Sequence, residues 1–257
     1  MEFVDTHCHI HFNDYANAES AINDAKSAGV TRLICVGCTL GDSHAAANFA
    51  KAHKSVWFSA GVHPHDSSNF LATKDAPAQL NRLLQEPKAV AIGEIGLDYY
   101  RQNSPKNEQA KCLRAQIEIG LSTKLPFIFH VRDGWQDFWP IIDEYKVKNA
   151  VLHSFSAGPK QLDEALTRGF YVSLNGIMTF TKEASQLQAA REIPNDKLLL
   201  ETDAPFLTPV PFRGERCEPK HVRSTAEFLA NLRAESLESL ALNTTVNALK
   251  LFSLRNA

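Results

Sequence analysis

The chain has 257 residues, of which 44% are hydrophobic and 22% are charged. This composition is typical of a soluble globular protein and excludes global disorder. The 27 basic and 29 acidic residues give a formal charge of -2, which argues against non-specific coating of nucleic acid by a basic surface. Binding of a polyanion would therefore need a local basic patch.

Short apolar runs alternate with longer amphipathic segments along the chain. The runs predict buried strands, and the segments with a helical period predict helices. The predicted strands are Phe3–Asp5, Arg32–Val36, Val56–Ala60, Ala89–Gly93, Pro126–His130, Ala150–His153, Phe170–Leu174 and Leu198–Thr202. The clearest predicted helices are Ala16–Ala28, Lys106–Thr123, Lys182–Glu192 and the segment after Ser236.

About eight strand–helix units follow one another without a linker, which predicts parallel strands joined by right-handed crossovers. A closed α/β barrel of the (β/α)8 TIM type takes about 250 residues. We therefore expect residues 1–257 to form a single barrel domain, with an open doubly wound sheet as the alternative. The proline-rich segment Pro205–Pro219 is expected to be a long loop on the active face.

The N-terminus has no basic segment followed by an apolar one, and no apolar run approaches the roughly 18 residues of a membrane span. The five cysteines are scattered and odd in number, so they do not predict a disulfide framework. Cys35 and Cys38 form a CxxC, but no second pair exists that would complete a zinc site. A cytoplasmic protein without a membrane partner is expected.

Six possible metal ligands lie at or just after the ends of five predicted strands. They are His7, His9, Glu94, His130, His153 and Asp203. Parallel strands all point one way, so their carboxyl ends share one rim, where barrel enzymes have their active sites. Any one of these histidines could be an ordinary hydrogen-bonded residue, but packing alone favours apolar groups at such positions. The joint pattern therefore predicts a metal site.

Four imidazoles and two carboxylates exceed the needs of one tetrahedral zinc ion and suit two divalent ions that share a carboxylate. We expect Glu94 to be the bridge and to be catalytic. His7, His9 and Asp203 would complete one ion, and the other two histidines the second. Asp203 could also act as a general base toward water. This ligand set admits Zn²⁺, Mn²⁺, Co²⁺ or Mg²⁺.

Several motifs resemble those of the TatD-type metal-dependent deoxyribonucleases, over residues 1 to about 255. The motifs are VDTHCH (4–9), GVHPH (61–65), IGEIGLDYY (92–100), HVR (130–132), HSFS (153–156), ETDAP (201–205) and PVPFRG (209–214). The resemblance implies a distorted TIM barrel, the same six ligands, and a divalent-metal nuclease acting on DNA, often from the 3′ end of single strands. Ser154, Ala157 and Cys217 depart from the usual family pattern without removing a ligand.

Five cations lie near the predicted rim: Arg101, Arg132, Arg213, Arg216 and Lys220. The planar fork of arginine matches phosphate oxygens, so Arg132 and Arg213 are predicted to bind substrate. The alternative is a set of surface charges with intramolecular partners such as Glu215 and Glu218.

Aromatic residues also lie on the predicted loops: Tyr99, Tyr100, Trp135, Phe180, Phe206 and Phe212. They could stack on bases, although most are expected to pack the loops onto the barrel. Tyr99 is predicted to bind substrate, as is His63 at the end of the third strand.

These observations together predict a metal-dependent hydrolase of nucleic-acid phosphodiester bonds, with DNA or RNA as substrate and no obligate protein partner. A hydrolase of a lactone, amide or phosphotriester on the same metal site is one alternative. Many such enzymes bridge their metals with a modified lysine, whereas Glu94 occupies the corresponding strand here. A non-catalytic, metal-dependent nucleic-acid-binding protein is the other alternative.

Overall fold

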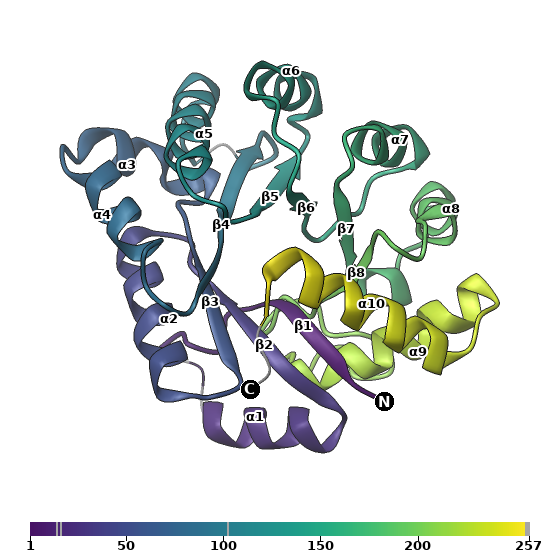
Figure 1. Cartoon of the computed structure of the whole chain (residues 1–257). Coiled ribbons are helices and arrows are strands. Elements are labelled where there is room, and N and C mark those ends of the chain that lie inside the picture. Colours follow the sequence, from purple (N-terminus) through teal and green to yellow (C-terminus); the bar gives the residue numbers. More distant parts are fainter. Residues whose placement is uncertain (14, 16, 102, 255–257) are drawn as a thin grey trace. The chain divides into compact units, whose positions relative to one another are not determined.

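Strands and helices alternate along the computed structural model, which describes residues 1–13, 15, 17–101 and 103–254 (Figure 1). The strands are β1 (Phe3–Cys8), β2 (Val30–Val36), β3 (Val56–Ala60), β4 (Ala89–Asp98), β5 (Phe127–Arg132), β6 (Ala150–Leu152), β7 (Tyr171–Leu174) and β8 (Leu198–Leu200). The helices are α1 (Ala18–Ser27), α2 (Leu40–Ala52), α3 (Ser67–Ala72), α4 (Ala76–Leu83), α5 (Lys106–Leu121), α6 (Trp135–Tyr145), α7 (Pro159–Thr167), α8 (Ala184–Glu192), α9 (Val222–Arg233) and α10 (Leu237–Phe252). Short 3-10 turns form η1 (Pro64–Asp66), η2 (Gly176–Thr179) and η3 (Pro219–His221). Within this described part, no helix is long and apolar enough to cross a bilayer.

The strands follow one another in the sheet in chain order, from β1 to β8. The strand pairs whose register is resolved, such as β1 with β2 and β4 with β5, are parallel. A doubly wound sheet would reverse its order at a switch point, so this consecutive order rules out that alternative. Among the described residues, β1 and the segment after β8 share an isolated bridge between Cys8 and Ala204.

Several predicted bounds differ from those observed. Val56–Ala60 is confirmed as β3, but β4 continues past Gly93 to Asp98. Glu94 therefore lies inside its strand, and the prediction that it follows the strand was wrong. The first predicted helix begins at Ala16, which lies outside the described residues; α1 is observed from Ala18.

Two glycines allow β4 to keep pairing with β5. Gly93 has φ +146° and Gly96 has φ +153°, a region that side chains other than that of glycine rarely adopt. A Cβ atom would lie 2.5 Å from the Ile128 oxygen at Gly93 and 1.8 Å from the His130 oxygen at Gly96. A sequence reading that treats glycine as the end of a strand therefore fails here.

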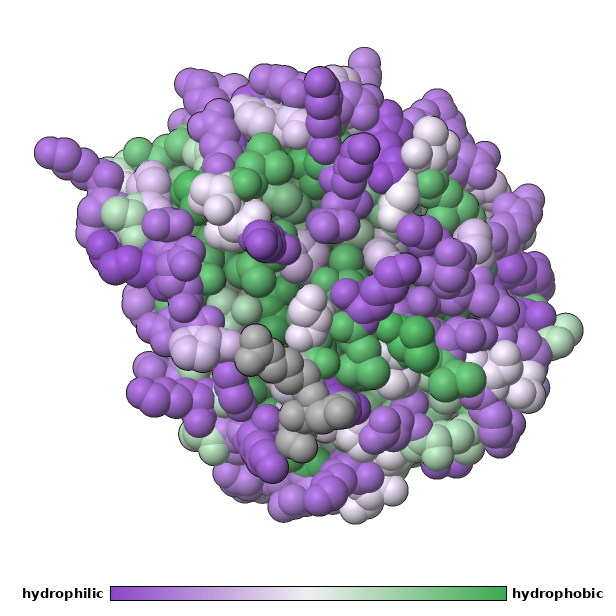
Figure 2. Space-filling model, viewed as in Figure 1, coloured by the Kyte–Doolittle hydropathy of each residue, from purple (hydrophilic) through white to green (hydrophobic). Residues whose placement is uncertain are grey.

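The described chain forms two compact units, which we describe separately. The first unit comprises Met1–Cys35 and His153–Ala257, and the second comprises Val36–Leu152. In the first unit, α10 packs against β1 and β8. Figure 2 shows a mainly hydrophilic face with hydrophobic side chains over α10, where Leu242 and Val246 are exposed. In the second unit, α5 packs against β4, and α2 against β3.

Candidate metal centre

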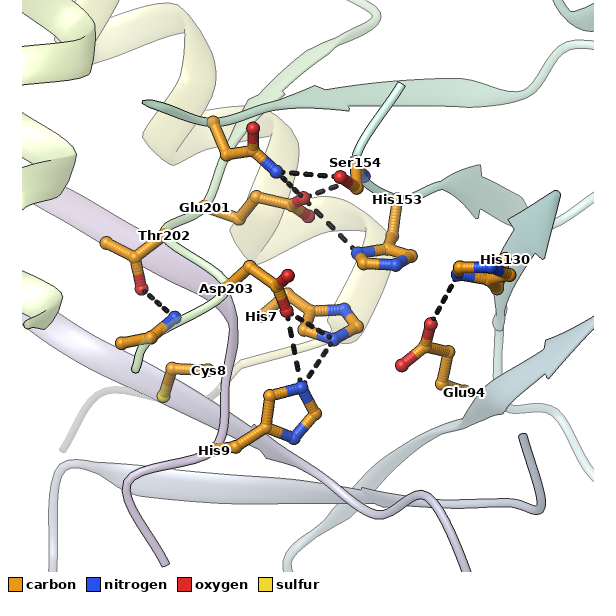
Figure 3. Close-up of polar contacts among 12 residues, drawn as sticks. His7, Cys8, His9, Glu94, His130, His153, Ser154, Glu201, Thr202 and Asp203 are labelled. Atoms are coloured by element: carbon orange, nitrogen blue, oxygen red, sulfur yellow. Dashed lines mark hydrogen bonds and ion pairs between the residues drawn. The ribbon is translucent and has the colours of Figure 1, made fainter. Parts of the chain in front are cut away.

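Three imidazoles and one carboxylate meet in the first unit (Figure 3). The Nε2 atoms of His7 and His9 are 3.2 Å apart. The Oδ1 atom of Asp203 lies 3.6 Å from Nε2 of His7 and 3.3 Å from Nε2 of His9. The ring of His153 stacks on that of His7, with centroids 3.8 Å apart. The predicted convergence of these four residues is thus present within this unit.

Backbone hydrogen bonds between β1 and the segment after β8 hold this cluster. The Asp203 N–H donates to the His7 oxygen at 2.8 Å, and the His9 N–H donates to the Ala204 oxygen at 2.7 Å. Cys8 is fully buried and donates through its thiol to the Ile34 oxygen. His7 and His9 therefore point to one side of the strand and Cys8 to the other, as the alternation of side chains requires.

The spacing of the donor atoms fits a shared metal ion. Ligand bonds of about 2.0–2.1 Å in a tetrahedral site put neighbouring donors roughly 3.3 Å apart. The three distances among His7, His9 and Asp203 are 3.2, 3.3 and 3.6 Å. A hydrogen bond could account for any one of these distances. All three distances together match the spacing of three ligand atoms on one face of a coordination tetrahedron, here two imidazole nitrogens and one carboxylate oxygen.

Burial alone would raise the pKa of Asp203, but the hydrogen bond with His9 and the nearby charges of His7 and His153 hold it below its ordinary value. The carboxylate is therefore ionised at neutral pH, as a ligand or a general base must be.

The carboxylate of Glu201 contacts the Nδ1 side of the His153 ring. Its Oε1 atom lies 3.3 Å from Nδ1 of His153 and accepts the backbone N–H of Ser154 at 2.7 Å. The amide of Asn175 donates to the same oxygen at 3.1 Å and to the Ser154 hydroxyl at 2.9 Å. Burial would raise the pKa of Glu201, but the charge and hydrogen bond of His153 lower it. Sequence reasoning missed Glu201, although it lies two residues before Asp203.

Asp5 fixes the neighbouring backbone. It accepts the Thr202 hydroxyl at 2.6 Å and the Thr202 N–H at 2.9 Å. The N–H of His7 lies 3.3 Å from the same carboxylate. The strand that carries His7 is thus tied to the residue that precedes Asp203.

A second imidazole–carboxylate cluster lies in the second unit. Nδ1 of His130 is 2.8 Å from Oε1 of Glu94, and Nε2 of His63 is 3.6 Å from the same oxygen. The thiol of Cys38 lies 3.7 Å from Oε2 of Glu94. Burial lowers the pKa of His63 to about 3, an effect that the charge of Glu94 partly offsets. The neutral imidazole is the form that binds metals.

Asp98 extends this second cluster. Its Oδ2 atom lies 2.9 Å from Nε2 of His65 and 3.4 Å from Nε2 of His130. Burial would raise the pKa of Asp98, but hydrogen bonds from His130, from the backbone of Arg101 and from His65 depress it. The position of His65 in the GVHPH motif does not by itself indicate this contact with the Asp98 carboxylate.

The residues predicted to bind substrate differ in their surroundings. Arg132 is exposed, and Cζ of Arg213 lies 4.0 Å above the ring of Phe180. The Tyr99 hydroxyl donates to Asp137 at 2.8 Å, and Lys220 forms an ion pair with Glu218, as the surface-charge alternative predicted.

Most of the six aromatics pack within the protein, as expected. Trp135 stacks on Trp139, and Phe212 stacks on His221. Tyr100 is 62% exposed and Phe206 is 53% exposed.

Comparison with known proteins identifies the chain. The family model described as TatD related DNase matches residues 4–253. The chain belongs to the TatD-related DNase family. It is 36% identical over 251 residues to the Bacillus subtilis protein named uncharacterized metal-dependent hydrolase YabD, covering 96% of this chain and 98% of that one. It is 34% identical over 245 residues to the Citrobacter koseri 3′-5′ ssDNA/RNA exonuclease TatD, covering 92% and 93%.

A solved structure extends the similarity to the fold. The crystal structure of YjjV, a TatD homologue from Escherichia coli, matches with a TM-score of 0.91 and 25% identity over 98% of each chain. The predicted fold class is confirmed as an α/β barrel of the TIM type with eight parallel strands. This member of the TatD family is a metal-dependent hydrolase, with candidate histidine and carboxylate ligands in both units.

Proposed function

We propose that this protein hydrolyses phosphodiester bonds of single-stranded nucleic acid, in the manner of a 3′-5′ exonuclease. The proposal rests chiefly on the spacing of His7, His9 and Asp203, whose donor atoms fit one divalent ion. It is supported by the 34% identity to a protein named for exonuclease action on single-stranded DNA and RNA.

His7, His9 and Asp203 would hold one divalent ion, Glu94 and His130 would hold another, and His153 would be a further ligand. When bound, such ions stabilise negative charge on a phosphoryl group and increase the acidity of water. Asp203 stays ionised because of its histidine neighbours, so it can accept the proton of the attacking water. Zn²⁺, Mn²⁺, Co²⁺ and Mg²⁺ are the candidate ions.

Four side chains are proposed to contact the substrate. The guanidinium groups of Arg132 and Arg213 suit phosphate oxygens because each offers a planar pair of donors. His63 is close to Glu94 and is neutral at physiological pH, so it can donate a hydrogen bond to a phosphate oxygen. Tyr99 follows β4 directly and is held by Asp137.

The experiment is digestion of end-labelled single- and double-stranded oligonucleotides with each of the four ions. We expect a ladder that shortens from the 3′ end, with single strands cleaved faster. The double variant Glu94→Ala, Asp203→Ala should bind the oligonucleotide without cleaving it. Turnover of a lactone or phosphotriester without any cleavage of oligonucleotides would overturn the proposal, and unchanged cleavage by the double variant would refute the site.

A further inference from the structure

Two consecutive tyrosines at the end of β4 have different environments. The Tyr99 hydroxyl donates to Asp137, and Nζ of Lys106 lies 4.5 Å from the centre of its ring. The Tyr100 side chain, in contrast, is 62% exposed. Covering the apolar faces of this ring with a ligand would gain free energy.

Arg132 lies over one face of this ring. Its Cζ atom lies 3.7 Å from the centre of the Tyr100 ring, and the arginine itself is exposed. The pairing of β4 with β5 fixes this proximity, because Asp98 is opposite Arg132 and the Tyr99 N–H donates to the Arg132 oxygen at 2.8 Å. Arg132 covers one face of the ring, so the exposed area lies on the other face and the edges.

Asp98 connects this aromatic surface with the second cluster of metal-ligand candidates. Its Oδ1 atom accepts the backbone N–H groups of Tyr100 and Arg101, each at 3.0 Å. Its Oδ2 atom faces His65 and His130. One buried carboxylate therefore fixes both the backbone beneath Tyr100 and the imidazole of a proposed ligand. A surface held in place in this way loses little entropy on binding.

We propose that Tyr100 and Arg132 form a subsite for one unpaired nucleobase, which stacks on the open face of Tyr100 while Arg132 contacts an adjacent phosphate. This inference rests on the proposed function. A flat ring beside a guanidinium matches a base joined to a phosphate, and such stacking tolerates any base. Bases inside a duplex are covered on both faces by their neighbours, so the subsite favours single strands.

The test compares oligonucleotides that carry either a base or an abasic sugar at successive positions near the 3′ end. Stacking on an aromatic side chain contributes about 1–3 kcal/mol, or roughly 5- to 150-fold. Tyr100→Ala should lower both the affinity for single strands, measured by fluorescence anisotropy, and kcat/KM by this factor. Tyr100→Phe should retain most of both. With the abasic sugar at one particular position, wild type and Tyr100→Ala should become equal.

The control variant is Tyr145→Ala, which removes a tyrosine on α6 that is hydrogen-bonded to Glu118. It should bind and cleave every oligonucleotide as the wild type does. The subsite is refuted if Tyr100→Ala binds single strands as tightly as the wild type, or if its loss is the same with and without the base at every position. If the wild type binds single strands and shows this base dependence but cleaves none, the subsite stands and the proposed function fails.

Discussion

The buried carboxylate of Glu201 lies 3.3 Å from Nδ1 of His153 (Figure 3). The same oxygen accepts the Ser154 N–H and the Asn175 amide, so its position is fixed from three sides. A carboxylate beside one ring nitrogen of a histidine, with the other nitrogen directed to a metal, is the usual arrangement behind a metal-binding imidazole. We therefore expect Glu201 to act as a positioning residue for His153, a proposed ligand.

Glu201→Gln should weaken metal affinity. The substitution keeps the size of the side chain but removes the charge that orients His153, and losses of outer carboxylates typically cost about 10- to 100-fold in metal affinity. Competition with a chromogenic chelator measures this change. Glu86→Gln, at an exposed position, is the matched control and should not alter affinity. An unchanged affinity in Glu201→Gln, with the fold intact by circular dichroism, would contradict the positioning role.

Asp203→Asn should abolish most hydrolysis while leaving nucleic-acid binding in place. The amide cannot accept a proton at neutral pH, and it binds a cation less strongly than a carboxylate. We expect kcat to fall by at least about 100-fold, the usual contribution of a general base. Oligonucleotide affinity, measured by anisotropy, should stay near the wild-type value. Asp196→Asn, at an exposed site in the same unit, serves as the control. Near-normal kcat in the Asp203 variant would remove it from the mechanism.

Removal of metal should stop catalysis reversibly. Ligands of mixed imidazole and carboxylate type release a divalent ion to a strong chelator, and the proposed hydrolysis depends on the bound ions. Dialysis against EDTA should therefore abolish oligonucleotide cleavage, and one of Zn²⁺, Mn²⁺, Co²⁺ or Mg²⁺ should restore it. Full activity in protein shown by elemental analysis to be metal-free would be incompatible with the proposed chemistry.

Gly96→Ala should destabilise the protein and disturb the second cluster. The added Cβ would lie 1.8 Å from the oxygen of His130, and β5 must move to make room. Gly169→Ala is the control. Gly169 also has a positive φ, +78°, so an alanine there is strained in its backbone, but the added Cβ would meet nothing within 4 Å. The difference between the two variants therefore reports the steric clash. We expect Gly96→Ala to reduce the free energy of unfolding by at least about 2 kcal/mol more than the control does. Equal effects in urea denaturation would show that β5 accommodates the methyl group.

The amino-acid sequence predicts the fold because strand and helix patterns alternate along the chain. It predicts most of the candidate ligands because they lie near the ends of these strands. Val56–Ala60 is a continuous apolar run and its bounds are confirmed, and the HxH spacing of His7 and His9 puts both rings on one side of β1. The length of β4 could not be predicted, since Gly93 and Gly96 normally signal an end rather than a close approach of two strands. The length of β4 depends on the close packing of β4 against β5, which is a tertiary contact.

The supporting residues were harder to find. Glu201 follows an apolar strand and has the same composition signal as a surface carboxylate; only its contacts with Ser154 and Asn175 reveal its role. Likewise, the sequence of the pair Tyr99–Tyr100 does not indicate which side chain forms a hydrogen bond within the protein and which is exposed to water. Exposure of consecutive residues depends on neighbouring elements that are distant in the chain.

Anomalous diffraction from crystals soaked in Mn²⁺ or Zn²⁺ tests the central claim most directly. The account predicts one peak within about 2.0–2.2 Å of donor atoms of His7, His9 and Asp203, and a second bonded to Glu94 and His130. Crystals of active protein with no peak at either cluster, or with ions bound only elsewhere, would contradict it.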